Sequence, residues 1–464
     1  MPGLFQGLEI GKRALLSHQY RLQTIGHNIA NVDTPGYTRQ RVSISPSYPE
    51  QSAIGQVGSG IQVDNIRHIR DLFLGEQYRE AKKYQGQWSY KEKVLSQIES
   101  LFNEPNDNSL NDLLNKFWDS WSQLSTNADS SNNREIILAQ ADQMINGFHQ
   151  LAWNLDSLRS SIDRDMNNLT YQINSLVSEI ANLNNQIKTV ELGDTRANDL
   201  RDSRDLLTDQ LAEIIDVRTV EKPNGATQVY MGSMILVDGA DAFKIGTVVE
   251  NVDGQPISKL VWQGTNVQLK NLNGQLKGLT EMRDQIIPEY KNRLNELARS
   301  LVTEVNRLHQ SGYGEDGTTG IAFFDPAYTD ASTIRLNTFV QDDINKIVSS
   351  AGVDGDNLIA LAIADLRNTK VMSSGTKTLN EFYNSLVGSL GIEVKEATSF
   401  SGNYELLINQ IDNSRQSVQG VSLDEEMANL IKSQHAYDAA ARVITAMDEA
   451  LDTVIYGMGI VGRS

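Results

Sequence analysis

The two ends of this 464-residue chain carry apolar residues at matching seven-residue intervals. The amino-terminal stripe consists of Leu8, Leu15, Leu22 and Ile29, and the carboxy-terminal stripe of Leu423, Leu430, Tyr437, Ile444 and Leu451. A seven-residue apolar repeat predicts an amphipathic helix that packs along another helix. Isolated helices of this length are marginal in water without an apolar partner. We therefore expect the two ends to meet as a coiled coil, with the rest of the chain carried between them.

The charges at the two ends favour pairing of the ends with each other. Residues 1–45 contain five Lys or Arg and two acidic residues, whereas residues 423–464 contain three basic and seven acidic residues. Opposite charge on two helices contributes mainly to the specificity of their pairing. The alternative is a pair of amphipathic helices packed on one globular core, since short seven-residue runs are common in helical proteins.

Between the ends, the pattern predicts a long helical rod that carries a small β domain. Spacings of four and three alternate through Ile162, Met166, Leu169, Ile173, Leu176, Ile180, Leu183, Ile187 and Val190. This spacing is typical of a coiled-coil seam. The period then changes to two from Val217 to Leu276, with glycine-containing turn signals that predict about six strands. Helical spacing resumes at Thr280, so we expect the strands at the far tip of a helical hairpin.

Helix ends divide this mainly α chain into three domains. Pro35 and Gly36 end the first helix. Residues 45–66, rich in Ser, Gly and Pro, are expected to form a hinge-like connection. Ser422, with Glu425 three positions later, predicts a capping box at the last helix. The expected domains are a terminal coiled coil (1–45 with 421–464), a helical rod (46–216 with 279–420) and an inserted β domain (217–278).

The composition excludes several classes of function. A net charge of −18 argues against nucleic acid as a partner, because phosphate binding needs a basic face. Apolar runs stay well below the ~18 residues of a membrane helix, so no membrane span is expected. The amino terminus lacks the unbroken apolar stretch of a cleaved signal peptide, so secretion is expected without one. The absence of cysteine excludes disulfides and thiolate chemistry.

Catalytic, cofactor-binding and metal-binding patterns are not found in the sequence. The six histidines lie far apart, and no HExxH pair occurs. One GxGxxG runs from Gly312 to Gly317, but it follows a predicted helix and contains Glu315 and Asp316, which would repel a pyrophosphate. We interpret it as a flexible loop. The chain is expected to have no enzyme activity, cofactor or metal; an enzyme in the β domain and a secreted long-helix adhesin or effector are the alternatives.

Four segments resemble one family. The segment 28–37 is similar to the amino-terminal motif of the bacterial flagellar axial proteins, which are the rod, hook and hook-associated proteins. The residues that carry this motif are Asn28, Asn31, Thr34, Pro35, Gly36 and Tyr37. The carboxy-terminal segment 421–444 resembles the hook-associated members more closely. Segments 196–205 and 306–314 agree with those members and argue against rod and hook proteins.

This resemblance implies a structural protein of the bacterial flagellum, whose subunits form a ring that connects the hook to the filament. The paired termini would form the inner tube, and their nine stripe residues the assembly interface. The long helices would lie outside it, and the β domain would project outward. The implied partners are further copies, the hook protein, hook-associated protein 3 as second junction protein, and an export chaperone on the carboxy-terminal helix. The implied location is extracellular, reached by type III export without signal cleavage.

Overall fold

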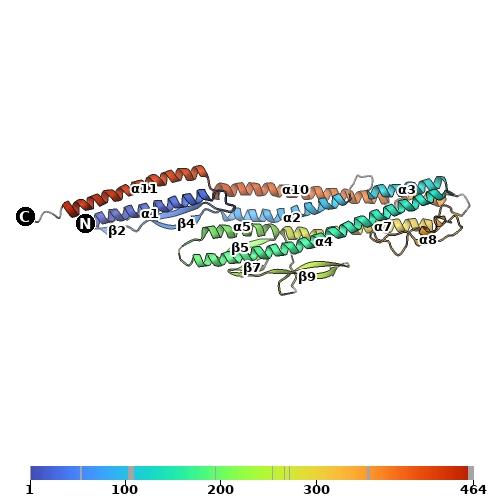
Figure 1. The fold of residues 1–464 in the computed structure, drawn as a ribbon, viewed down its shortest axis with the longest axis horizontal. Helices are drawn as coiled ribbons and strands as arrows, with labels where there is room; N and C mark the ends of the chain where they lie inside the picture. Colours follow the sequence, from blue (N-terminus) through green and yellow to red (C-terminus); the bar gives the residue numbers. More distant parts are fainter. Residues whose placement is uncertain are drawn as a thin grey trace, which may run out of the picture.

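A computed structural model describes residues 2–52, 55–102, 109–193, 195–252, 254–265, 267–270, 272–352 and 356–457. The molecule is a long rod, and the described parts of both ends of the chain lie at the same end of it (Figure 1). The chain leaves the terminal helix α1, runs to the far end of the rod, and returns through α10 to the terminal helix α11. The expected mainly α fold with a small inserted β region is confirmed.

Long helices make up most of the rod. The α-helices are α1 (Pro2–Ala30), α2 (Leu72–Phe102), α3 (Leu110–Thr126), α4 (Ser131–Val190), α5 (Asn198–Ile214), α6 (Gly274–Glu281), α7 (Ile287–His309), α8 (Thr338–Asp342), α9 (Leu358–Ala364), α10 (Leu379–Gln419) and α11 (Leu423–Asp452). Shorter turns are the π-helices η1 (Met282–Ile286) and η4 (Thr453–Gly457) and the 3₁₀-helices η2 (Ile344–Lys346) and η3 (Asp365–Arg367).

The strands form antiparallel hairpins and one small sheet. They are β1 (Gln40–Pro46), β2 (Glu50–Ser52), β3 (Gly55–Val57), β4 (Ile61–His68), β5 (Val217–Glu221), β6 (Thr227–Met231), β7 (Met234–Asp238), β8 (Asp241–Ala242), β9 (Ile245–Val252) and β10 (Gln255–Trp262). Strand β1 pairs with β4, β2 with β3, and β9 with β10, while β5 to β8 form a four-stranded meander. The six strands from β5 to β10 agree with the number predicted for the β domain.

Helix α4 is the longest of the described helices and runs along much of the rod (Figure 1). It is 60 residues long, which corresponds to roughly 90 Å of continuous helix. Its apolar stripe from Ile162 to Ile187 is buried except for the partly exposed Leu183, whereas Val190 lies exposed at the end. The stripe differs from a two-helix coiled-coil seam, because helix α5 and strands β7, β9 and β10 pack against α4. A stripe of this spacing defines a buried face, but it does not reveal whether the partner is a helix or a sheet.

Strands β5 to β10 lie along the flank of α4 and α5, beside the middle of the rod (Figure 1). The placement predicted from the sequence, at the tip of the rod, is therefore wrong. Two asparagines on α4 account for the observed position. Asn184 donates from Nδ2 to the carbonyls of Thr227 (2.8 Å) and Gly239 (3.0 Å). Asn174 donates to the carbonyl of Ile245 (2.8 Å) and accepts from its amide (2.9 Å), so the helix supplies partners for strand backbone groups.

Two connections differ from those predicted. The segment predicted to be a hinge, residues 45–66, contains β2, β3 and most of β4, and the paired strands β1 and β4 contact α1. Strands β1 and β4 thus lie against the terminal helix. The helix restarts near Pro288, as expected. The π-helix η1 ends at Ile286, and α7 begins directly after it with Pro288 in the first turn of α7.

The far end of the rod is closed by aromatic packing. Trp121 and Phe323 lie with ring centroids 5.4 Å apart, and Phe323 also contacts His309 and Phe324. The glycine-containing segment that follows α7 is not the flexible loop predicted from the sequence. The buried Arg134 forms an ion pair with Glu315 at 2.7 Å, and the Tyr313 amide donates to the Ser350 carbonyl at 2.9 Å. These contacts hold the segment as a packed turn.

His309 makes the stability of this end dependent on pH. Burial lowers the pKa of His309 to about 4. Its Nδ1 donates to the Ile321 carbonyl at 2.7 Å and its Nε2 accepts from the Val348 amide at 3.1 Å, so the ring is neutral. The unfolded chain, with an ordinary pKa near 6.5, binds a proton between pH 6.5 and 4 that the folded chain does not.

We predict that the free energy of unfolding falls as the pH falls through this window, with a loss of about 3 kcal/mol by pH 4. Chemical denaturation at pH 7, 5.5 and 4 measures it. The variant His309→Gln should lose this part of the pH dependence, whereas His435→Gln, on α11, should keep it. An equal pH dependence in the unmodified chain and His309→Gln would contradict the assignment.

Candidate assembly interface

Helices α1 and α11 lie side by side at the terminal end of the rod, as predicted (Figure 1). The fully buried positions of α11 are Glu426, Ser433 and Ala440, which are spaced seven residues apart. Glycines on α1 meet α11 closely: a Cβ added to Gly11 would lie 2.8 Å from Ile444, and one added to Gly7 would lie 2.9 Å from Met447. The seam between α1 and α11 therefore combines the buried small and polar residues with Ile444 and Met447, which pack against the glycines of α1 and are accommodated because glycine has no side chain.

Of the nine predicted interface residues, Ile444 packs against Gly11 in the seam, and the others flank the buried positions or lie outside the seam. Eight of them are partly exposed, namely Leu8, Leu15, Leu22, Ile29, Leu430, Tyr437, Ile444 and Leu451, while Leu423 is 48% exposed. On α11, Leu430, Tyr437 and Ile444 alternate with the three buried seam positions at spacings of three and four. The periodicity thus identified the correct side of α11. It did not reveal the three buried positions of α11, because a pattern of large apolar residues does not include Glu, Ser or Ala.

Large apolar side chains are left uncovered on the terminal helix pair. Those on α1 are Phe5, Leu16 and Tyr20, and those on α11 are Leu423, Met427, Ile431 and Val443. Met427 and Ile431 are four residues apart, so they lie one above the other on α11. Exposed apolar patches of this kind mark surfaces that other proteins cover. The side chains between α1 and α11 are therefore buried, whereas the outer side of the helix pair, which faces away from this contact, remains uncovered.

Asn28, from the predicted family motif, connects α1, its exit segment, β1 and α11. Its Nδ2 donates to Glu426 Oε2 (2.9 Å) and to the Gln40 carbonyl (3.0 Å). Its Oδ1 accepts from the Tyr37 hydroxyl (2.7 Å) and from the Gln40 amide (2.9 Å). The residue is 1% exposed, and all four hydrogen-bonding positions of its amide are used.

The remaining motif residues shape the exit from α1. Asn31 donates to the His27 carbonyl at 3.0 Å and accepts from the Thr34 hydroxyl at 3.1 Å. After Pro35, Gly36 has φ +78°, a left-handed conformation that favours glycine, and a Cβ there would lie 3.1 Å from Leu206 of α5. The exit thus turns directly against the rod. Burial raises the pKa of Tyr37, which keeps its hydroxyl protonated as the donor to Asn28.

An acidic stripe on α5 receives the exit segment, and the sequence prediction missed its role. Its members are Asp199, Asp202, Asp205 and Asp209. Asp202 accepts from the Thr38 amide (2.8 Å) and hydroxyl (2.6 Å) and lies 2.9 Å from His68 Nδ1. Asp205 forms an ion pair with Arg70. Spacings of three and four could have identified the stripe as one helix face, but its partners are distant in the sequence.

Asp209 extends the stripe to the helices of the rod. It forms ion pairs with Arg79 of α2 at 3.3 Å and with Arg415 of α10 at 3.0 Å. Asp199, at the other end, accepts from Gln40 Nε2 at 2.6 Å. The stripe therefore ties the base of the terminal helix pair to α2 and α10 through charged and polar contacts.

The start of α11 uses only half of the predicted capping box. Ser422 accepts from the Glu425 amide at 3.5 Å. The Glu425 carboxylate instead pairs with Arg39 Nη1 at 2.6 Å, because a charged donor stabilises it more than a backbone amide would. Arg39 also donates its amide to the Gln419 carbonyl at 2.8 Å, so the exit of α1 and the start of α11 are joined twice.

The residues that the structure describes contain no group of three or more His, Asp or Glu arranged to hold a metal ion. No helix in the described part of the chain is long and apolar enough to cross a membrane.

Removing the Asn28 side chain should release the terminal helices from each other. Asn28→Ala leaves a buried carboxylate and two backbone groups without partners, which costs about 3 kcal/mol of opening free energy in α1 and α11. Amide hydrogen exchange should report lower protection there and unchanged protection in α4. The control Gln23→Ala removes an exposed amide from the same helix. Equal protection in the two variants would contradict the role of Asn28.

Family models match three parts of the chain. Residues 95–324 match the flagellar hook-associated protein FlgK helical domain. Residues 8–38 match the flagella basal body rod protein family, and residues 413–455 match the flagellar basal body rod FlgEFG protein C-terminal family. The terminal matches cover the motif and the helix pair described above.

Known relatives match along the whole chain. Flagellar hook-associated protein 1 of Bacillus subtilis (strain 168) is 34% identical over 507 aligned residues, which cover 100% of both chains. That of Salmonella typhimurium is 25% identical, covering 94% of this chain and 97% of the relative. The solved flagellar hook junction protein FlgK from Burkholderia pseudomallei shares the fold, with a TM-score of 0.66 at 16% identity over 74% of this chain and all of that one. The chain therefore belongs to the flagellar hook-associated protein 1 family.

Proposed function

We propose that this chain is the structural subunit of the junction between flagellar hook and filament, where copies of it form a ring. The observation that carries this proposal is the full-length 34% identity to flagellar hook-associated protein 1 of Bacillus subtilis. The family is one of flagellar structural proteins, and the adhesin, effector and enzyme alternatives find no support in the comparisons.

The outer side of the terminal helix pair supports assembly through the ends of the chain. In the seam between the helices, Ile444 and Met447 pack against Gly11 and Gly7, and Ser433 and Ala440 are buried, so the seam needs no further subunit. Met427 and Ile431 remain exposed, and burial of such side chains contributes about 25 cal/mol per Å² of apolar surface. In this proposal the eight partly exposed stripe residues lie in or beside the contact between α1 and α11, whereas Leu423 and the other exposed apolar residues contact neighbouring subunits.

The three-part division of the chain fits this role. The terminal domain, residues 1–45 and 421–464, would line the inside of the ring. The rod domain, residues 46–216 and 279–420, would surround it, and the β domain, residues 217–278, would lie on the flank of the rod. The hairpin contact with α1 would place the residues up to 68 with the terminal domain.

The partners follow from the place in the flagellum. They are other copies of this chain, the hook protein on one side, and hook-associated protein 3 on the other. An export chaperone would cover the apolar outer side of α11 before assembly, when no neighbour is present. The final location would be extracellular, after type III export without a cleaved signal peptide.

Deletion of the gene in its host should leave hooks without filaments. Electron microscopy of cells stained for both structures measures the outcome. Restoration of filaments by the unmodified gene controls for effects on neighbouring genes. Normal filaments in the deletion strain would refute the proposed function.

Within the terminal domain, Ile431→Asp should abolish filament formation while leaving the purified subunit stable. Ile431 is 51% exposed in the single chain, so a carboxylate there costs little until a neighbour must cover it. The control is Leu192→Asp, which places the same charge at an 82% exposed leucine beyond the end of α4. Normal filaments with Ile431→Asp would show that this side of α11 stays uncovered in the assembly.

A further inference from the structure

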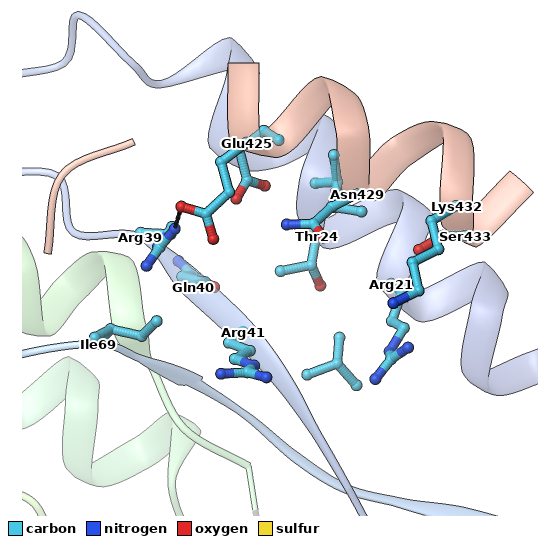
Figure 2. A pocket seen from close by; sticks show the side chains of 13 residues that line it. Arg21, Thr24, Arg39, Gln40, Arg41, Ile69, Glu425, Asn429, Lys432 and Ser433 are labelled. Atoms are coloured by element: carbon cyan, nitrogen blue, oxygen red, sulfur yellow. Dashed lines mark hydrogen bonds and ion pairs between the residues drawn. The ribbon is translucent and has the colours of Figure 1, made fainter. Parts of the chain in front are cut away.

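A basic cleft opens where α11 crosses α1 and β1, with a volume of about 240 Å³. Figure 2 shows Arg21 of α1 and Arg41 of β1 on one side of this cleft, with Lys432 extending from α11 toward them. The acidic residues of the same cleft are already engaged. Glu425 pairs with Arg39 at 2.6 Å, and Glu426 accepts from Asn28 at 2.9 Å.

The three cations of the cleft, Arg21, Arg41 and Lys432, have no partner of their own. Among the residues that the structure describes, none forms an ion pair or a hydrogen bond with these three side chains. The strand register adds to the excess of positive charge, because Arg41 lies directly opposite Arg67 in the β1–β4 ladder. Like charges directly opposite each other destabilise a strand pair. An anion from outside this part of the molecule would relieve the repulsion.

Matching anions lie on the outer edge of α11. Asp438, Glu449 and Asp452 are exposed, and none has an ion pair with another described residue. Glu449 follows the buried Ala440 by nine residues, which at 100° per residue places it on the side of α11 opposite the seam. Asp452 is one turn further along and lies next to it. These two carboxylates together would offer two negative charges to one site.

A single chain cannot fill its own cleft with these carboxylates. Lys432 and the Glu449–Asp452 pair are about 18 residues apart on one continuous helix, which corresponds to roughly 27 Å. The cleft and the acidic edge are therefore separate surfaces of one rigid element. A contact between two different surfaces of identical chains joins the copies head to tail. Repetition of such a contact produces a ring or a helical stack.

We infer that the basic cleft formed by Arg21, Arg41 and Lys432 binds Glu449 and Asp452 on α11 of a second copy of this chain. This inference rests on the proposed function, since it names the subunit contact within the junction. The chain has a net charge of −18, so the unpaired cations of the cleft are complementary in charge to an acidic surface of a neighbouring copy.

Charge reversal tests the contact in the host. In the deletion strain, the double variant Arg21→Glu with Arg41→Glu should reduce the fraction of cells with filaments about tenfold or more, because like charges then face each other across the contact. Adding Glu449→Arg and Asp452→Arg to the same chain should restore filaments. The control, Lys188→Glu with Lys270→Glu, makes the same change in net charge at exposed positions outside the cleft and should keep filaments.

Paired cysteines test the same contact without reversing a charge. The natural chain has no cysteine, so Arg41→Cys with Glu449→Cys introduces the only thiols. In isolated junctions treated with oxidant, this pair should yield disulfide-linked multimers on a non-reducing gel. Arg41→Cys alone, and Lys188→Cys with Glu449→Cys, should remain monomeric.

Three results would overturn the inference. One is a normal number of filaments with Arg21→Glu and Arg41→Glu. Another is loss of filaments that the reversed acids fail to restore, which would assign the cleft to an anion of different origin, such as another flagellar protein. The third is an Arg41→Cys and Glu449→Cys pair that forms junctions but no linked multimers. Filaments in the deletion strain itself would instead refute the proposed function.

Discussion

The rigid geometry of the terminal end depends on the fully bonded side chain of Asn28. It donates to Glu426 of α11 and to the Gln40 carbonyl of β1, and it accepts from Tyr37 and the Gln40 amide. A rotation of α1 against either neighbour would break at least one of these bonds in a buried environment, where an unpaired polar group is costly. The helix pair, the exit turn and the hairpin therefore move as one unit, tied to the rod by the acidic stripe on α5.

The division of α11 into two sides explains how one helix serves both folding and assembly. Its inner side carries Glu426, Ser433 and Ala440, which permit close contact with α1. Its outer side carries exposed Met427 and Ile431 near the start and Glu449 and Asp452 near the end. The buried residues on the inner side of α11 stabilise the subunit, and the large apolar and charged residues on its outer side remain available to neighbouring subunits. Mixed apolar and charged contacts of this kind are typical of specific interfaces.

Local patterns in the sequence predicted the helices, the exit at Pro35 and Gly36, and the six strands, because each depends on near neighbours in the chain. Contacts between distant residues were less accessible. The position of the strands depends on Asn174 and Asn184, which look like ordinary surface residues of a helix. The partners of Asp202 lie more than a hundred residues away. The buried Glu426, Ser433 and Ala440 of α11 give no hydrophobic signal, so the apolar stripe did not reveal the centre of the contact between α1 and α11.

A structure of the assembled junction tests the central claim most directly, namely that α1 and α11 pair within one chain and present their outer side to neighbours. The account predicts that Asn28 and Glu426 of the same chain remain bonded in the ring, and that neighbouring subunits cover Met427 and Ile431. A junction in which α1 pairs with α11 of another chain, or in which Met427 and Ile431 face solvent, would contradict it.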